Sequence, residues 1–236
     1  MSLEQNVSTV LQNIADAAQR AGRRTEEVTL LAATKTRDAA TVREIIACGV
    51  TTVGENRVQE MTQKLAQNAY EGAQLHFIGR LQTNKVRQVA GKVALIHSVD
   101  SLRLANEINK AMARLREQDA SVPAQDVLVE VNIGGELSKG GIEPQDLPAF
   151  LEQLAGLDGL RVRGLMCIPP PAETPDEARR YFSSMKALFD RNTHLLAQEV
   201  PHILSMGMSD DYEQAILEGS TLVRVGTALF GPRIYT

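Results

Sequence analysis

The chain has 236 residues, of which 43% are hydrophobic and 23% charged, the composition of an ordinary globular protein. Its net charge of −4, its 4% of aromatic residues and its lack of tryptophan argue against nucleic-acid binding, which needs a basic face and stacking side chains. The sequence has neither a run of about 18 apolar residues nor a basic lead into an apolar run, so we expect no membrane span and no signal peptide. Two cysteines, Cys48 and Cys167, are too few for a disulfide framework and suit a reduced, cytoplasmic protein.

The chain opens with apolar residues at three- and four-residue spacing, which predict an amphipathic helix that ends near Gly22. The next segment, residues 30–35, is an apolar run closed by Lys35 and predicts a buried strand. In proteins built of strand–helix units, ligands bind at the strand ends, and a neutral amine there can attack a carbonyl. The alternative is that Lys35 is a surface lysine that happens to follow a strand.

Short apolar runs and stretches with helical spacing alternate along the rest of the chain, a pattern that predicts a parallel sheet. Eight strand–helix units in a chain of this length favour a single (β/α)8 TIM barrel with an extra N-terminal helix, in one domain over residues 1–236. A doubly wound open sheet is the structural alternative. The predicted strands are residues 30–35, 50–53, 75–78, 93–96, 127–133, 162–168, 203–205 and 222–225.

In such a barrel, residues at the strand ends surround one cavity. Ser209 precedes a predicted helix, and Gly226 and Thr227 follow the last strand at the start of another, a placement in which barrels often bind phosphate. The alternative is that Ser209 only caps a helix and Gly226 only makes a turn. The candidate site residues are Lys35, Asn56, Ser205, Met206, Ser209, Arg224, Gly226 and Thr227.

Arg224 lies between Val223 and Val225 in the last predicted strand, so it points to the opposite face from both valines. An arginine that points into a barrel needs a partner, because an unpaired buried charge is costly. Arg224 therefore either makes a structural ion pair or points at an acceptor atom of a bound ligand.

Several other polar residues indicate no further site. The four histidines lack the spacing of metal ligands, so we expect no metal site and interpret each as an ordinary hydrogen-bonded histidine. The glycines and lysine of residues 135–140 are not in the order of a phosphate-binding P-loop. Asp210 and Asp211 are interpreted as acids in the first turn of a helix, where they suit its dipole.

Six motifs in the same order resemble those of the pyridoxal phosphate homeostasis protein family. The resemblance to the bacterial members covers nearly the whole chain. The motifs are residues 30–36 (LLAATKT), 54–60 (GENRVQE), 76–85 (HFIGRLQTNK), 164–166 (GLM), 204–211 (LSMGMSDD) and 223–231 (VRVGTALFG).

The resemblance implies a barrel similar to that of alanine racemase, with pyridoxal 5′-phosphate as cofactor and Lys35 as the Schiff-base lysine. It places Ser209, Gly226 and Thr227 at the phosphate, Arg224 at the pyridine nitrogen and Asn56 beside the ring. Because an arginine keeps its proton, it leaves that nitrogen unprotonated and weakens the ring as an electron sink.

The implied function is therefore cofactor binding that serves intracellular vitamin B6 and amino-acid homeostasis, without robust catalytic activity. We expect a monomer whose candidate partners are apo-enzymes that receive the cofactor. Lys139 matches a lysine of the family pattern and is either a second, transient aldehyde site or a solvated loop lysine.

Two enzyme functions remain as alternatives. A small amino-acid racemase of the alanine racemase barrel type needs an acid or base on each face of the substrate carbon. In alanine racemase the second base comes from an extra domain of the partner subunit, and we expect no such domain after the eighth strand here. The tyrosines near predicted strand ends, Tyr212 and Tyr235, match no racemase motif. The other alternative is an aldolase barrel that acts on a sugar phosphate through a cofactor-free lysine.

Overall fold

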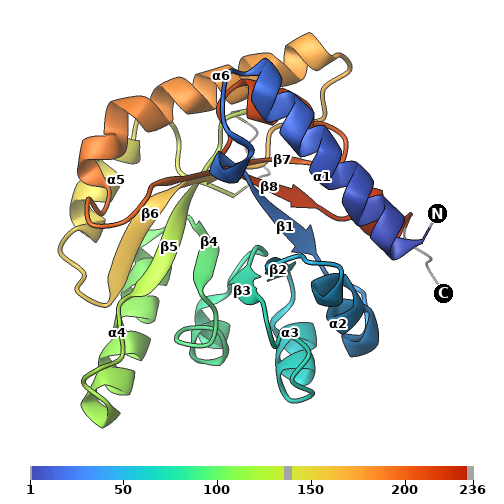
Figure 1. Ribbon diagram of the computed structural model, residues 1–236. Helices are drawn as coiled ribbons and strands as arrows, with labels where there is room; N and C mark the ends of the chain where they lie inside the picture. Colours follow the sequence, from blue (N-terminus) through green and yellow to red (C-terminus); the bar gives the residue numbers. More distant parts are fainter. Residues whose placement is uncertain (1, 136–139, 233–236) are drawn as a thin grey trace.

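The computed structural model describes residues 2–135 and 140–232. Its eight strands form a closed barrel in chain order, in which β8 pairs with β1 and all neighbours run parallel (Figure 1). The predicted (β/α)8 barrel is thereby confirmed. The strands are β1 (Thr29–Ala33), β2 (Thr52–Glu55), β3 (Gln74–Phe77), β4 (Leu95–Val99), β5 (Gln125–Val131), β6 (Leu160–Cys167), β7 (Ile203–Met208) and β8 (Leu222–Val225).

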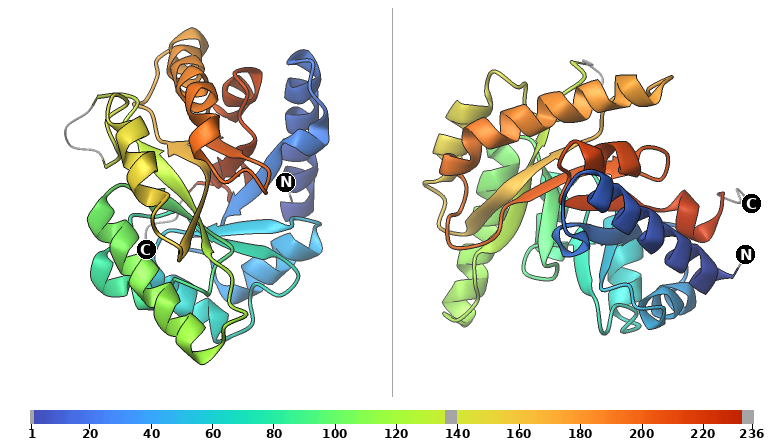
Figure 2. Two further views of the ribbon diagram at one scale, coloured as in Figure 1. Left: turned by 90° about the vertical axis from the view of Figure 1, so that its left-hand side faces the viewer. Right: turned by 45° about the horizontal axis from the view of Figure 1, so that its top comes forward.

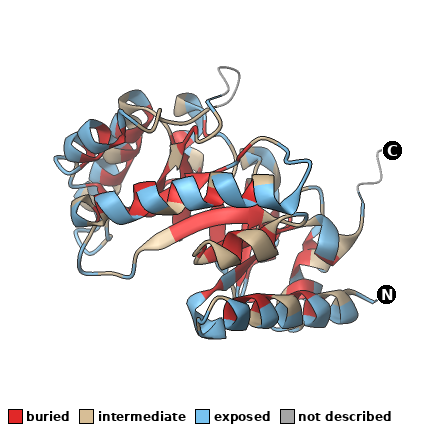
Figure 3. Ribbon diagram, turned by 90° about the horizontal axis from the view of Figure 1, so that it is seen from above, coloured by how far each residue is buried: buried red, intermediate tan, exposed pale blue. Residues whose placement is uncertain are grey.

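The helices lie around the outside of the barrel, as the two views of Figure 2 show. Their exposed residues face outward and their buried residues face the strands (Figure 3). The α-helices are α1 (Leu3–Arg20), α2 (Ala39–Ala47), α3 (Val58–Leu65), α4 (Leu102–Gln118), α5 (Leu147–Leu154), α6 (Pro175–Asn192), α7 (Tyr212–Leu217) and α8 (Thr227–Phe230). The 3₁₀ segments are η1 (Thr25–Glu27), η2 (Thr83–Gln88) and η3 (Thr193–Leu195).

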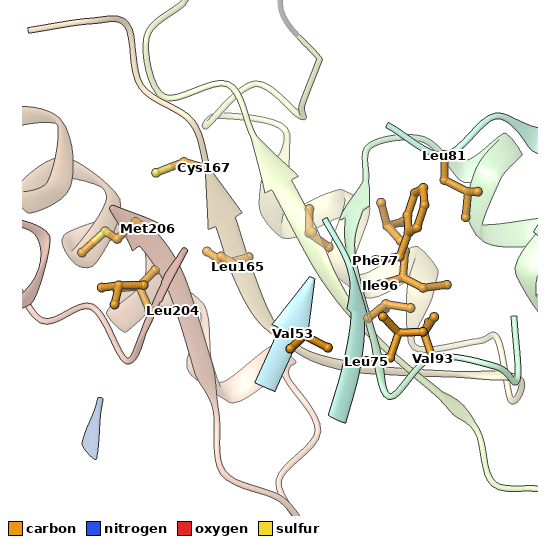
Figure 4. Packing of buried hydrophobic residues seen from close by; sticks show 14 of the residues in the cluster. Val53, Leu75, Phe77, Leu81, Val93, Ile96, Leu165, Cys167, Leu204 and Met206 are labelled. Carbon is orange, nitrogen blue, oxygen red and sulfur yellow. The ribbon is translucent and has the colours of Figure 1, made fainter. Parts of the chain in front are cut away.

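The main hydrophobic core lies between the barrel and the helices, and Figure 4 shows part of it, including Val53, Phe77, Ile96 and Leu204. Alternate residues of the strands point inward, where a smaller cluster of Leu95, Leu128 and Met166 fills part of the barrel. The rest of the interior is unusually polar, because strands β3, β4, β7 and β8 each contribute a buried polar side chain. These residues are His76, His97, Ser205 and Arg224.

The N-terminal helix α1 closes the outside of the barrel next to the last two helices. Asn6 Nδ2 donates to the carbonyl oxygen of Leu229 in α8 at 2.8 Å, and Asn13 Nδ2 donates to the hydroxyl of Tyr212 in α7 at 3.0 Å. The first helix therefore holds the segments that follow the seventh and eighth strands. Among the helices of the described ranges, none is both long and apolar enough to span a bilayer.

Most strand bounds differ from the prediction by one to three residues, as in β2 (52–55 rather than 50–53) and β5 (125–131 rather than 127–133). Three elements differ for an identifiable local reason. The helix predicted after β3 is the 3₁₀ segment η2, because only a short stretch separates β3 from the turn at Gly91, where φ is +73°. Strand β4 spans residues 95–99 rather than 93–96, and its pairing with β5 shifts between Ile96 and Val99. Strand β7 continues to Met208 rather than ending at residue 205, since its pairing with β8 also shifts.

Candidate functional site

A cavity of about 540 Å³ lies at the carboxyl ends of the strands, within the usual size range of small-molecule sites. Six of the eight predicted site residues line this cavity, although they come from four different strand ends. Cationic side chains outnumber acidic ones in its wall, which suits an anionic ligand. The six residues are Lys35, Asn56, Ser209, Arg224, Gly226 and Thr227.

Lys35 lies two residues after the end of β1, and the residues on both sides of it are fixed. The hydroxyl of the fully buried Thr34 donates to Glu55 Oε1 at 2.6 Å. Thr36 has a φ of +64°, a conformation that is strained for a β-branched residue, and its N–H donates to Glu60 Oε2 at 2.8 Å. The tight turn after β1 thus sets the direction in which the Lys35 side chain leaves the barrel wall.

A buried ion pair supports this turn from behind. Lys64 of α3 donates to Glu55 Oε1 at 2.7 Å and to the carbonyl oxygen of Thr34 at 2.9 Å. Both charged side chains are almost completely buried. Burial, followed by the charge of Glu55, raises the pKa of Tyr70 well above its usual value, so Tyr70 stays neutral in this cluster. The sequence alone does not reveal this cluster, because its residues come from β2, α3 and the segments that follow β1 and α3.

Asn56 follows β2 and is held by a close approach of the loop after β3. A Cβ atom on Gly79 would lie 2.1 Å from the carbonyl oxygen of Asn56, so only glycine fits at position 79. The side-chain oxygen Oδ1 of Asn56 is buried, yet no hydrogen-bond donor of the described residues reaches it. Because buried acceptors are normally paired, this atom fits a donor on a ligand in the cavity.

Arg224 points into the barrel, as predicted, and Val223 and Val225 pack in the outer core. Its Nη1 donates to the carbonyl oxygen of Ser205 at 3.0 Å and to Ser205 Oγ at 2.6 Å, and its Nη2 donates to the carbonyl oxygen of Cys167 at 2.9 Å. Within the described residues, no carboxylate forms a salt bridge with Arg224. The alternative of a structural ion pair is therefore wrong for these residues, and the guanidinium is held by neutral acceptors at the cavity wall.

Ser209 joins the loop after β7 to the start of α8. Its Oγ accepts hydrogen bonds from the N–H groups of Gly226 at 3.1 Å and Ala228 at 3.3 Å. Its hydroxyl proton is therefore free to donate to an anion in the cavity. The alternative that Ser209 only caps the helix after β7 is wrong, because α7 begins at Tyr212 and Asp211 is the residue before it.

Asp211 is the residue before α7 rather than part of its first turn, which corrects its interpretation as a first-turn acid. Its Oδ1 accepts the N–H of Met208 at 2.6 Å and so closes the turn at the end of β7. Asp210, in contrast, lines the cavity.

Four charged residues line the cavity that are not among the predicted site residues, namely Arg37, Arg80, Glu130 and Asp210. The guanidinium of Arg37 lies 5.2 Å from the ring centre of Phe230 and donates to the carbonyl oxygen of Gly231 at 3.3 Å. Burial raises the pKa of Glu130, and so does the charge of Asp100. The available signal for Glu130 is its position as a lone acid between the valines of β5.

Two predicted site residues do not line the cavity. Ser205 is fully buried below Arg224, inside the barrel. Met206 is also fully buried and packs in the outer core near Leu204 (Figure 4). The assignment of both residues to cofactor binding stays a prediction, and any contribution of Ser205 in this structure passes through Arg224.

The histidines behave as predicted where the structure records their contacts. His76 Nδ1 and His97 Nε2 lie 3.1 Å apart and share a hydrogen bond, and His202 Nε2 bonds the carbonyl oxygen of Ala197 at 3.1 Å. No cluster of three or more metal-ligating side chains occurs within residues 2–135 and 140–232. Lys139 and Tyr235 lie outside the described residues.

Comparison with known proteins agrees with this site. The family model for the N-terminal domain of alanine racemase matches residues 6–233. A curated protein of Aquifex aeolicus, named pyridoxal phosphate homeostasis protein, is 46% identical over 235 residues and covers 100% of both chains.

Solved structures show the same similarity. A crystal structure of an unknown protein from Bifidobacterium adolescentis has a TM-score of 0.87 and 38% identity, covering 97% of this chain and 94% of its own. The structure of PipY from Synechococcus elongatus with PLP bound has a TM-score of 0.77 and 35% identity, covering 92% of this chain and 100% of its own. By sequence and by fold, the chain belongs to the pyridoxal phosphate homeostasis protein family.

Proposed function

We propose that this protein binds pyridoxal 5′-phosphate through a Schiff base to Lys35 and serves intracellular vitamin B6 and amino-acid homeostasis. The observation that carries this proposal is the convergence of Lys35, Ser209 and Arg224 on one cavity of about 540 Å³. Residues 1–236 would act as one cofactor-binding domain without robust catalytic activity. The relatives named above, one of them solved with PLP bound, support the proposal.

The residues of the cavity fit the chemical groups of this cofactor. The Ser209 hydroxyl and the backbone around Gly226 and Thr227 would hold the phosphate. Arg224, whose proton is permanent, would donate to the pyridine nitrogen, and the orphan acceptor of Asn56 would take a donor at the ring edge. When bound, the cofactor supplies an aldehyde that a neutral lysine amine attacks with loss of water.

The site supports binding better than racemisation. Two-base racemisation needs a second acid or base opposite the lysine. The acids that line the cavity are Glu130 and Asp210, whereas no tyrosine or histidine of the described residues lines it. The Tyr212 hydroxyl is instead bonded to Asn13 outside the barrel. An arginine at the pyridine nitrogen also weakens the stabilisation of a carbanion, on which racemisation depends.

The proposed function also includes a compartment, an oligomeric state and recipients of the cofactor. We propose that it acts in the cytoplasm as a monomer and passes the cofactor to apo-enzymes. Cys48 and Cys167 are both free thiols, which fits a reducing compartment. The cavity opens at the strand ends, where a recipient protein or solvent has access to it.

The decisive experiment locates the lysine that carries the cofactor. The protein is incubated with pyridoxal 5′-phosphate, reduced with borohydride and digested, and the modified peptides are identified by mass spectrometry. We expect Lys35 to carry the label and Lys35→Ala to lose both the label and the visible absorbance of the bound cofactor. The control Lys92→Ala, at an exposed lysine before β4, should keep both.

A cofactor that stays bound and coloured in Lys35→Ala would overturn the assignment of this lysine. Absence of any cofactor on the wild type, with turnover of a sugar phosphate, would favour the aldolase alternative. Deuterium exchange at the α-carbon of amino acids at useful turnover would favour the racemase.

A further inference from the structure

A continuous chain of hydrogen bonds crosses the inside of the barrel. His76 of β3 bonds His97 of β4 at 3.1 Å, and His97 Nδ1 lies 3.2 Å from Ser205 Oγ of β7. Ser205 Oγ in turn accepts from Arg224 Nη1 of β8 at 2.6 Å. All four side chains are buried, and none exposes more than 6% of its surface. We refer to these four residues as the interior chain.

The interior chain joins the walls of two separate cavities. Arg224 lines the cavity that holds Lys35. His76 lines a second cavity of about 1130 Å³, whose wall comes from the first residues of the strands, such as Thr29 of β1 and Thr52 of β2. This second cavity lies at the opposite end of the barrel and shares no lining residue with the first.

The direction of every bond in the interior chain follows from Arg224. An arginine can only donate, so the hydroxyl proton of Ser205 must point to another acceptor. The acceptor within reach is His97 Nδ1, which is therefore unprotonated. The proton of His97 then lies on Nε2 and is donated to His76 Nδ1, and His76 carries its own proton on Nε2.

With these bond directions both imidazoles are neutral, because His97 Nδ1 accepts from Ser205 and His76 Nδ1 accepts from His97. Burial has the same effect, since it lowers the pKa of His76 to about 4 and the pKa of His97 well below its usual value. For His76 the charge of Arg163 adds to this lowering, and that of Asp126 opposes it.

We propose that Ser205, His97 and His76 are positioning residues that fix the orientation of Arg224 toward the cofactor. This inference rests on the proposed function, in which Arg224 meets the cofactor. Three of the five guanidinium N–H groups are used by Ser205 and Cys167, and two remain for the cavity. The hydroxyl of Ser205 can hold one of these groups only while its own proton is accepted by His97.

The first test needs no cofactor. Nitrogen-15 NMR of histidine-labelled protein at pH 7 distinguishes the two neutral tautomers and the charged ring. We expect His76 and His97 both to be neutral with the proton on Nε2, and we expect Ser205→Ala to change the signals of His97. A charged His97, or a proton on its Nδ1, would overturn the proposal.

The second test measures whether His97 acts through Arg224. His97→Phe keeps a ring of similar size but removes the acceptor for Ser205, and we expect it to weaken binding of pyridoxal 5′-phosphate about tenfold, the effect of one displaced hydrogen bond to a charged group. It should also shift the absorbance maximum of the bound cofactor. His97→Asn, whose Oδ1 can replace Nδ1, should restore most of the affinity. The control His202→Phe changes a histidine of the second cavity outside the interior chain and should leave affinity unchanged.

The decisive comparison repeats His97→Phe in the Arg224→Ala background. If His97 acts only by positioning Arg224, the substitution has no further effect on affinity there. An equal loss in both backgrounds would mean a general structural role and would overturn the proposal. If His97→Phe does not fold, Ser205→Ala and Ser205→Thr give the same comparison.

A wild-type protein that binds no pyridoxal 5′-phosphate would refute the proposed function instead, and the tautomer measurement would still test the interior chain.

Discussion

Thr36 is the residue at which the strain of the candidate site is concentrated. Its φ of +64° lies in the left-handed region, which a β-branched residue rarely adopts. The residue keeps this conformation because its N–H is bonded to Glu60 and because Thr34, two residues earlier, is fixed by Glu55. Strain of this kind next to Lys35 indicates that the direction of the lysine matters more than the stability of the turn.

Replacing Thr36 by glycine should separate stability from function. We expect Thr36→Gly to raise the free energy of unfolding of the cofactor-free protein by about 1 kcal/mol, because glycine adopts the left-handed region without a steric cost. The same variant should bind pyridoxal 5′-phosphate more weakly, since the backbone after Lys35 is less restricted. Urea unfolding and cofactor titration measure the two effects.

The matched change Thr41→Gly, within helix α2, should have the opposite sign and lower stability by roughly 0.5 to 1 kcal/mol. Equal destabilisation by both substitutions would show that Thr36 is not strained.

For individual residues, the sequence predicts which side chains gather at the candidate site but not all of their hydrogen-bond partners. Lys35, Ser209 and Arg224 were assigned from their places at strand ends, and the barrel brings them to one cavity. The bond from Ser209 to the start of α8 was not predicted, because it depends on how the loop after β7 folds back. The bond between His97 and Ser205 was not predicted either, because it crosses the barrel between strands that are not neighbours.

Helix α3 supports the candidate site through Lys64, the charged residue that it buries. Lys64 reaches from α3 to the ends of β1 and β2, where it pairs with Glu55. A buried charge left without its partner is strongly destabilising. The helix is therefore tied to the two strands whose ends present Lys35 and Asn56.

Removing this lysine should cost the protein much of its stability. We expect Lys64→Met to lower the free energy of unfolding by about 3 kcal/mol, because Glu55 is left buried without a compensating charge. The control Lys92→Met, at an exposed lysine, should change stability by less than about 0.5 kcal/mol. Denaturant unfolding of both variants measures the difference, and similar values for the two would contradict a stabilising role for the pair.

Element order and type were largely predictable from the sequence, because the strands of a closed parallel barrel are continuous apolar runs between amphipathic helices. Strand ends were less predictable. Val93 is buried although it precedes β4, so hydrophobicity alone assigned the strand to residues 93–96. The pairing shift beside Ile96, which moves the strand to residues 95–99, is set by the neighbouring strand rather than by local sequence.

For the whole molecule, the polar interior of the barrel makes stability depend on pH. His76 has a pKa of about 4 in the folded protein, against an ordinary value of about 6.5, and the pKa of His97 is lowered as well. Between about pH 4 and pH 6.5 the unfolded chain binds more protons than the folded one. The contribution of the two neutral histidines to the free energy of unfolding is therefore complete above about pH 6.5, and it is lost as the pH falls toward 4.

We expect acid to unfold the protein through these two rings. Each histidine should contribute a slope of up to about 1.4 kcal/mol per pH unit across this window. Unfolding free energies measured in urea from pH 7.5 to pH 4.5 should fall less steeply for His76→Gln than for the wild type. His194→Gln, at an exposed histidine, should follow the wild-type curve. A slope unaltered by His76→Gln would mean that other groups govern acid unfolding.

The pairing of β8 with β1 also has a consequence for biosynthesis. Lys35 leaves the ribosome early, whereas Arg224, Gly226 and Thr227 belong to the last part of the barrel to be made. On the proposed function, a nascent polypeptide therefore presents the amine of Lys35 long before the groups that would hold the rest of a vitamin B6 molecule. Tight capture would then await synthesis of the eighth strand and the turn that follows it, so a loaded protein would be one whose synthesis had passed that point.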